Sequence, residues 1–346
     1  MLEDFIEIAQ KGIDLNADQM QQAIIWMLAG RAEDEHIGQL LLALRAKGEA
    51  VSEMVGAARG MRTMMTPIRS ERTGLLDTCG TGGDGSGTFN ISTATAIITA
   101  ACGVPTAKHG NRKITSATGS ADVLASLGVE IEADRKRVER CLNELGLCFC
   151  FAPMLHPAMK YVGQVRRQLG VPTLFNYLGP LCNPANASFQ VIGTGRGDLQ
   201  TKLAATLVQL PIEAAIVVRG LDGMDEVTLS AETSVYHVQY GMTTQFMWEP
   251  KSFGLETIKA EDLAVSGPEE SAARIRSILQ GESGPSRDIV LANAAAGLWV
   301  SGKTHSLFEG VELARRAIDR GDALGILTQL AKLTHDKLTH EQTQTG

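Results

Sequence analysis

The residues best suited to chemistry form a glycine-rich run, DTCGTGGDG at positions 77–85, directly after the short apolar segment Gly74 to Leu76. Glycine tolerates positive φ and carries no Cβ, so such a loop can wrap around a ligand with its backbone N–H groups turned inward. Inward-facing N–H groups bind anions, most often phosphate. We therefore expect a phosphate-binding loop, and the residues around it must decide which phosphorylated ligand it takes.

Two generic phosphate motifs match the chain, and both are rejected. Residues 80–85 fit the dinucleotide pattern GxGxxG, which also requires a helix at the last glycine and an acid about 20 residues later. Here residues 86–88 (SGT) prolong the loop, and residues 100–103 (AACG) contain no acid. Residues 297–304 (GLWVSGKT) fit the P-loop pattern, but they continue an apolar helical run and follow no strand. They predict the end of a buried helix that stops at Gly302.

An uncharged helix is predicted after the loop. Residues 90–93 (NIST) lead into ATAIITAAC at 94–102, which has no charge on any face and should be buried all round. Ser92 is the predicted N-cap, and free N–H groups at a helix start attract anions. A plain cap on a core helix is the alternative, but the neighbouring glycine loop favours an anion site.

Cations and hydroxyls follow the next predicted strand. The segment VPTAK (104–108) ends in a lysine and leads into HGNR (109–112), with Thr115, Ser116 and GSAD (119–122) beyond it. Cations, an amide and hydroxyls at the carboxyl end of a strand favour a phosphorylated sugar as the ligand. A solvated charged surface is the alternative.

A pair of adjacent acids, Asp225 and Glu226, stands in the loop GLDGMDE (220–226), after the apolar strand 214–218. Mg²⁺ prefers oxygen ligands and often uses one or two carboxylates together with substrate phosphates. An isolated pair of this kind is more typical of a solvated turn. Its position directly after a strand favours a metal site.

These motifs resemble, in the same order, those of the anthranilate phosphoribosyltransferases. The matching segments are GTGGD (80–84), NIST (90–93), KHGNR (108–112), GSAD (119–122), residues 156–184, GLDGMDE (220–226) and NAAA (293–296). The resemblance covers nearly the whole chain. It implies the third step of tryptophan synthesis from chorismate, in which the amine of anthranilate attacks C1 of 5-phospho-α-D-ribose 1-diphosphate (PRPP). The products are N-(5-phosphoribosyl)anthranilate and diphosphate.

The resemblance also implies site residues. For PRPP these are Gly80, Gly83, Asp84, Thr88, Asn90, Ile91, Ser92, Thr93, Lys108, His109, Gly110, Asn111, Arg112, Lys113, Ile114, Thr115, Ser116 and Ser120. For anthranilate they are Gly80, His109, Asn111 and Arg166, and for Mg²⁺, two ions per subunit, they are Ser92, Asp225 and Glu226. We assign no covalent nucleophile or general base, because diphosphate departs readily once its charge is neutralised. His109 is given an orienting or stacking role.

One position departs from the family pattern: Arg219 stands where the family usually has histidine, and it could pair with Asp222, with Asp225 or with diphosphate. Two other functions remain as alternatives. A pyrimidine nucleoside phosphorylase would carry a KxSGR-like loop instead of KHGNR, and it would not need Arg166. A nucleic-acid-binding relative would need a basic surface stripe, which a net charge of −7 disfavours.

Arg166 and Arg167 belong to a helix that His156-Pro157 should open and Gly170 should close. Helical spacing puts Arg167 on a polar face with Lys160 and Gln164, and Arg166 on the apolar side. A buried guanidinium requires an anion, and a planar carboxylate suits its geometry. An internal salt bridge is the alternative to a bound carboxylate, and the resemblance favours anthranilate.

Composition and periodicity indicate an α/β enzyme. The chain has 346 residues, of which 44% are hydrophobic, with six cysteines expected to be reduced, no apolar stretch of membrane-spanning length and no basic start typical of a signal peptide. We expect a cytoplasmic protein that binds neither nucleic acid nor membrane. Residues 1–73 show helical spacing and predict a small helical domain, and alternating strands and helices in 74–162 and 186–346 predict an α/β catalytic domain with a mostly parallel sheet. The resemblance adds that about residues 163–185 pack on the helical domain, and that the family forms homodimers through it.

Overall fold

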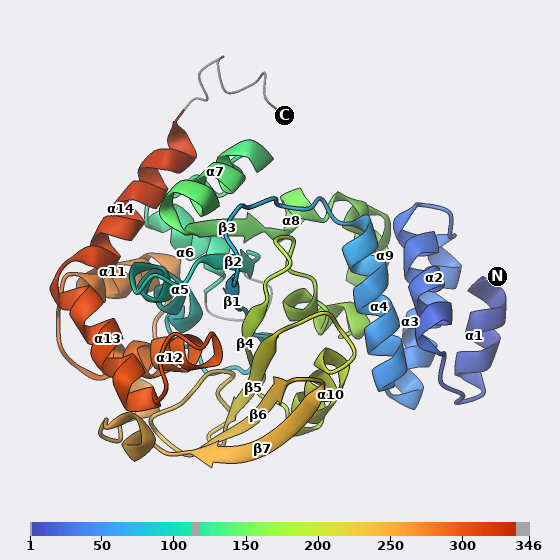
Figure 1. Ribbon diagram of the computed structural model, residues 1–346. Coiled ribbons are helices and arrows are strands. Elements are labelled where there is room, and N and C mark those ends of the chain that lie inside the picture. The colour runs from blue at the N-terminus through green and yellow to red at the C-terminus, as the bar shows by residue number, and fades with distance from the viewer. Residues whose placement is uncertain (1, 113–117, 337–346) are drawn as a thin grey trace.

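A group of helices lies beside an α/β body in the computed structural model, which describes residues 2–112 and 118–336 (Figure 1). The N-terminal helices are α1 (Leu2–Gln10), α2 (Ala17–Leu28), α3 (Asp34–Lys47) and α4 (Val51–Met64). All four lie within residues 1–73, the part of the chain that was predicted to be helical. Helix α2 begins with a capping box, in which the Asn16 side chain accepts from the backbone N–H of Gln19 and the Gln19 side chain accepts from that of Asn16.

The α/β body is built on one seven-stranded sheet in the order β3-β2-β1-β4-β5-β6-β7. The strands are β1 (Leu76–Thr78), β2 (Thr106–Gly110), β3 (Leu147–Phe151), β4 (Phe189–Gly193), β5 (Ala214–Gly220), β6 (Thr233–Gln239) and β7 (Met242–Trp248). Strands β1 to β5 pair in parallel, and β6 and β7 continue as an antiparallel edge. The predicted α/β class with a mostly parallel sheet is confirmed. The strand order reverses between β1 and β4, the position where open α/β sheets bind ligands.

The remaining helices cover the sheet and connect its strands. They are α5 (Ile91–Ala101), α6 (Ser120–Ser126), α7 (Arg135–Leu145), α8 (Ala152–Leu155), α9 (Lys160–Leu169), α10 (Gly197–Leu207), α11 (Pro268–Leu279), α12 (Pro285–Val300), α13 (Leu307–Asp319) and α14 (Asp322–His335). The 3-10 turns are η1 (Pro157–Met159), η2 (Leu174–Asn176), η3 (Gly179–Leu181), η4 (Pro250–Phe253) and η5 (Ala260–Leu263). No helix in the described part of the chain is long and apolar enough to cross a membrane.

Helices α5 and α12 form the buried centre of the α/β body, as the uncharged sequence of α5 and the apolar run that ends α12 predicted. The P-loop-like residues 297–304 lie at the end of α12, where Gly302 adopts a φ of 71° directly after the helix. The GxGxxG match is also no dinucleotide fingerprint, because the next helix starts only at Ile91. Both rejections of generic motifs are therefore confirmed.

A second core joins the N-terminal helices to the rest of the molecule. It includes Val162 and Val165 of α9, Leu199 and Leu203 of α10, and Val217 on one face of β5. Helix α9, which carries Arg166, is therefore packed on the helical region. Helix α10 links the same core to the sheet.

The end of β4 passes very close to the backbone of Asp225, so we expect position 193 to tolerate only glycine. A Cβ added at Gly193 would lie 1.6 Å from the carbonyl oxygen of Asp225, so Gly193→Ala must displace one of the two segments. We expect this variant to lose about 1–3 kcal/mol of unfolding free energy in urea titrations. Gly325→Ala in α14 is the control, because its Cβ meets nothing within 4 Å and should stabilise the helix by up to about 1 kcal/mol. Wild-type stability in Gly193→Ala would contradict the contact.

Candidate active site

A cavity of about 690 Å³ opens at the carboxyl ends of the parallel strands. The glycine loop, the start of α5 and the end of β2 line one part of it, and α9 with the residues of η2 and η3 line another. The cavity thus lies where the α/β body meets the helical region, at the reversal of strand order.

The cavity gathers most of the predicted site residues. Those that line it are Gly80, Gly83, Asp84, Thr88, Asn90, Ile91, Ser92, Lys108, His109, Gly110, Asn111, Arg112, Ser120, Arg166, Asp225 and Glu226. Thr93 does not line it: this residue is fully buried, and its backbone N–H donates to the Asn90 side chain over 3.1 Å. The predicted contacts of Lys113, Ile114, Thr115 and Ser116 lie outside the described residues.

The glycine loop is anchored at both ends and open in the middle. At its start, the backbone N–H of Thr81 donates to the carbonyl of Gly193 at the end of β4 (2.8 Å). At its end, the N–H of Phe89 donates to the carbonyl of Leu263 (3.0 Å). Between these anchors Gly82, Gly83, Gly85 and Gly87 all have positive φ, which only glycine adopts readily. The sequence therefore forms the ligand-wrapping loop that its composition predicted.

The start of α5 differs from the prediction in one detail. Asn90 is the N-cap, since its side chain accepts from the N–H of Thr93, and Ser92 lies in the first turn of the helix. The expectation that Ser92 is the cap was therefore wrong. The Ser92 hydroxyl instead accepts from the ammonium group of Lys108 (3.1 Å), which also donates to the carbonyl of Thr78 (2.7 Å). The buried Lys108 thus ties the N-terminus of α5 to β1.

Three carboxylates gather beside this helix start. The backbone N–H of Asp225 donates to the Asp84 carboxylate over 3.2 Å, and Glu226 follows directly. Burial, and then the charge of Asp84, raise the pKa of Asp225 to about 7, and burial and the charge of Asp225 raise the pKa of Glu226. Carboxylates that repel one another in a buried place are stabilised by a cation. The donors here are oxygen atoms, which fit Mg²⁺.

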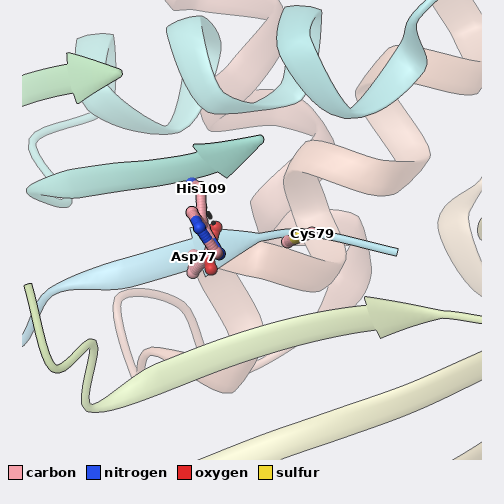
Figure 2. A group of neighbouring side chains, drawn as sticks. All are labelled: Asp77, Cys79 and His109. Carbon is pink, nitrogen blue, oxygen red and sulfur yellow. Dashed lines mark hydrogen bonds between the residues drawn. The ribbon is translucent and has the colours of Figure 1, made fainter. Parts of the chain in front are cut away.

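A second group, Asp77, Cys79 and His109, has potential metal ligands within 4.8 Å of one another (Figure 2). Other contacts occupy most of these atoms, although Oδ2 of Asp77 has no hydrogen-bond partner among the described residues. The backbone N–H of His109 donates to Asp77 (3.0 Å), and the His109 ring nitrogens face Gly179 and His156. Burial raises the pKa of the Cys79 thiol far above its usual value, so the thiol stays protonated. The group is better explained as a set of contacts that joins β1 to β2.

Arg166 is half-buried on α9, whereas Arg167 is exposed, as the helical register predicted. The Arg166 guanidinium lies over the ring of Phe175, with 5.4 Å from Cζ to the ring centroid, and it donates to the Asn176 side chain at 3.5 Å. Within residues 2–112 and 118–336 it forms no ion pair with a carboxylate. The alternative of an internal salt bridge is therefore not found, and the guanidinium remains available to an anion. Arg167 also lines the cavity, although it is exposed to solvent.

Arg219, the residue that departs from the family pattern, does not line the cavity. It points from β5 toward the start of α10, where a Cβ at Gly197 would lie 3.6 Å from its Cζ. In the described part of the chain it forms no ion pair with Asp222 or Asp225. The hydroxyl of Thr228 donates to Asp222 instead (2.6 Å). The suggested pairing of Arg219 with these acids was wrong.

Sequence reasoning missed several residues of the cavity. His156, Phe175, Asn176 and Gly179 line it, yet none of them was proposed as a site residue. All four fall within the stretch 156–184 that carries the family resemblance. That stretch was the available signal, but nothing in it showed which side chains face inward.

Comparison with known proteins places this geometry in a family. Residues 72–324 match the model of a glycosyl transferase family, a/b domain, and residues 3–65 match that of its helical bundle domain. Among curated proteins, the anthranilate phosphoribosyltransferase of Rhodopirellula baltica is 55% identical over 329 residues, covering 95% of this chain and 96% of that protein.

Solved structures show the same fold along nearly the whole chain. The crystal structure of anthranilate phosphoribosyltransferase from Thermus thermophilus has a TM-score of 0.91 at 41% identity, and the match covers 96% of this chain and 100% of that one. The Saccharomyces cerevisiae enzyme in complex with PRPP and Mg has a TM-score of 0.89 at 27% identity, covering 96% and 97%. The chain belongs to the anthranilate phosphoribosyltransferase family.

Proposed function

We propose that this protein is an anthranilate phosphoribosyltransferase, which transfers the 5-phosphoribosyl group of PRPP to the amine of anthranilate and releases diphosphate. One observation carries the proposal: a single cavity contains both a region suited to phosphate and metal and a separate guanidinium that has no carboxylate partner among the described residues. The first region suits PRPP, and the guanidinium suits the carboxylate of an aromatic acid. The names of the similar proteins agree with this substrate pair.

The phosphate region binds PRPP through the glycine loop, the start of α5 and the segment 108–112. Lys108 is buried with its ammonium group against Ser92, so it contributes fixed positive charge next to the helix N-terminus. Asn111 and Arg112 lie at the end of β2, where hydroxyls and phosphate oxygens of a phosphorylated ribose are within reach of loop residues. These residues act by positioning C1 of the ribosyl group for attack.

Asp225 and Glu226 would hold Mg²⁺, with Ser92 on the diphosphate side, and two ions would bind per subunit. The yeast relative contains Mg together with PRPP. When bound, the metal neutralises the leaving diphosphate. The acids of this chain accept it readily, because their mutual repulsion is relieved on binding.

The aromatic acid binds beside α9. Arg166 meets the carboxylate, and Asn111, Gly80 and the His109 ring complete the contact. The Phe175 ring beneath the guanidinium restricts its direction, so that a planar carboxylate approaches it edge-on. The amine is then directed toward C1, and no covalent intermediate is required.

We also propose the organisation of the whole protein. Residues 1–73 with 163–185 form the helical domain, and residues 74–162 and 186–346 form the catalytic domain. Two copies associate through the helical domain, and the enzyme works in the cytoplasm. The shared core of α9 and the N-terminal helices supports this division.

The reaction itself is the first test. Purified protein mixed with Mg²⁺, PRPP and anthranilate should consume anthranilate, followed as loss of its fluorescence, and EDTA should abolish turnover. Phosphorolysis of thymidine or uridine without consumption of anthranilate would transfer the assignment to the nucleoside phosphorylases. Duplex DNA binding that persists at physiological salt would favour the nucleic-acid-binding relative.

The metal site is tested by Glu226→Gln, which removes a charge with little change in volume. We expect kcat to fall about a hundredfold, roughly 2.7 kcal/mol, while the metal-free protein unfolds at the same temperature or a higher one, because a buried repulsion is removed. Glu256→Gln, at an exposed position outside the cavity, is the matched control and should behave as wild type. An unchanged rate at limiting Mg²⁺ would mean that the acid pair is only a turn.

The carboxylate site is tested by separating two adjacent arginines. Arg166→Ala should raise the KM for anthranilate at least about tenfold, or 1.4 kcal/mol, and leave the KM for PRPP nearly unchanged. Arg167→Ala is the control and should have little effect, because its side chain is exposed. Steady-state kinetics in which each substrate is varied in turn measure both KM values. If only Arg167→Ala impairs anthranilate use, the proposed role of Arg166 is wrong.

A further inference from the structure

His109 and His156 form a buried pair next to the proposed anthranilate site. Their Nε2 atoms lie 3.2 Å apart, although His109 is on β2 and His156 follows α8, 47 positions later in the chain. The ring centroids are 5.1 Å apart, and the planes meet at 46°. Only 4% of His109 and 6% of His156 is exposed. Nothing in the proposed function uses His156.

The hydrogen bonds fix the position of each proton. The Nδ1 atom of His109 lies 3.0 Å from the carbonyl oxygen of Gly179, which can only accept, so Nδ1 carries the proton. A neutral imidazole has one N–H, and the Nε2 atom of His109 is therefore bare. The Nε2 atom of His156 must then be the donor. Its Nδ1 is then left bare: no described residue forms a hydrogen bond of normal geometry with that atom, although the Cys182 backbone carbonyl lies near enough to favour a proton on the ring.

Both rings are held in the neutral form. Burial, and then the neighbouring His156, lower the pKa of His109 to about 3. Burial lowers the pKa of His156 to about 4, against a smaller opposing effect of the Cys182 backbone. The other titratable groups around His109 are Asp77 and Cys79 at β1, Lys108 beside it on β2, and Cys150 opposite it on β3. Asp77 accepts from the His109 backbone and leaves the ring nitrogens to Gly179 and His156.

We propose that His156 is a positioning residue that holds His109 as a neutral imidazole in the Nδ1–H tautomer, with neither ring nitrogen free to face the substrate. This inference rests on the proposed function and deepens it. A neutral ring with both nitrogens engaged contacts the aromatic acid through its face and C–H edges. It cannot compete with Arg166 for the carboxylate, as an imidazolium would, and it cannot take the proton of the amine.

The tautomers can be measured without any substrate. In full-length protein with ¹⁵N-labelled histidine, long-range ¹H–¹⁵N spectra distinguish protonated from bare ring nitrogens, and His109→Gln and His156→Gln identify the two rings among seven histidines. We expect Nδ1–H for His109 and Nε2–H for His156, unchanged from about pH 5.5 to 8. A midpoint of titration within that range, or Nε2–H at His109, would overturn the proposal.

Kinetics with a matched pair of variants test the consequence for the substrate. His156→Gln keeps an N–H donor near the position of Nε2, whereas His156→Leu has similar size and no donor. Loss of the donor removes the smaller cause that lowers the pKa of His109, while burial, the larger cause, remains, so the ring stays neutral and its Nε2 atom becomes free to face the substrate. For His156→Leu we expect the KM for anthranilate to rise about tenfold at both pH 6 and pH 8, with the KM for PRPP nearly unchanged.

The glutamine variant should stay within about threefold of wild type at both pH values, because it preserves the hydrogen bond. Equal losses in both variants, or an equal rise in the KM for PRPP, would mean that His156 only supports the fold. If the wild-type protein fails to consume anthranilate, the proposed function fails, while the tautomer measurement still decides the arrangement of the two rings.

Discussion

A close backbone approach beside the site, between Gly193 and Asp225, determines where the acidic loop lies. Strand β4 can run under this loop only because residue 193 has no Cβ, and the carbonyl of Gly193 also receives the N–H of Thr81. One glycine therefore fixes both the acid pair and the start of the phosphate-binding loop. Without a metal, burial and mutual repulsion raise the pKa values of Asp225 and Glu226. The backbone contact between Gly193 and Asp225 therefore holds together two acids whose charges repel each other.

The cations Lys108 and Arg166 are held in the site by uncharged neighbouring groups. Lys108 is held by a carbonyl and a hydroxyl and forms no ion pair with Glu226 within the described residues, although its charge lowers the pKa of that acid. Arg166 is supported by an aromatic ring and an amide. Within residues 2–112 and 118–336 neither cation has a hydrogen-bonded carboxylate, so both remain available to the substrates. An ion pair inside the cavity would leave less positive charge for the substrates.

Local sequence patterns predicted the elements of the site well. The glycine loop, the uncharged helix α5 and the false P-loop at the end of α12 could each be recognised, because composition and periodicity determine them within a few residues. The cap of α5 was assigned two residues too late, since Asn90 and Ser92 are both good caps and only the fold shows which backbone N–H each one meets. Thr93 was included with its neighbours, but the helix turns it into the core.

Contacts between distant segments could not be predicted. The approach of His156 to His109 depends on how α8 leaves β3, and no pattern in the sequence encodes it. The direction of Arg219 could have been predicted from the strand pattern: with a two-residue period it lies on the same face of β5 as Ala215 and Val217, whose side chains pack in the second core. The family resemblance suggested that the charge of Arg219 lies near the acidic loop. The two-residue period of β5 instead places it on the face of the strand that packs in the second core.

The shared core of the helical region, α10 and one face of the sheet has a consequence for the evolution and engineering of this chain. A fragment that began at the first strand would leave Leu199 and Leu203 of α10 and the packed face of β5 without their cover, a contiguous apolar strip of the kind that drives aggregation. The α/β body is therefore not expected to fold as an independent domain. Recombination that exchanges the N-terminal helices between relatives must carry α9 and a compatible α10 with them, and this couples substitutions more than a hundred residues apart in sequence.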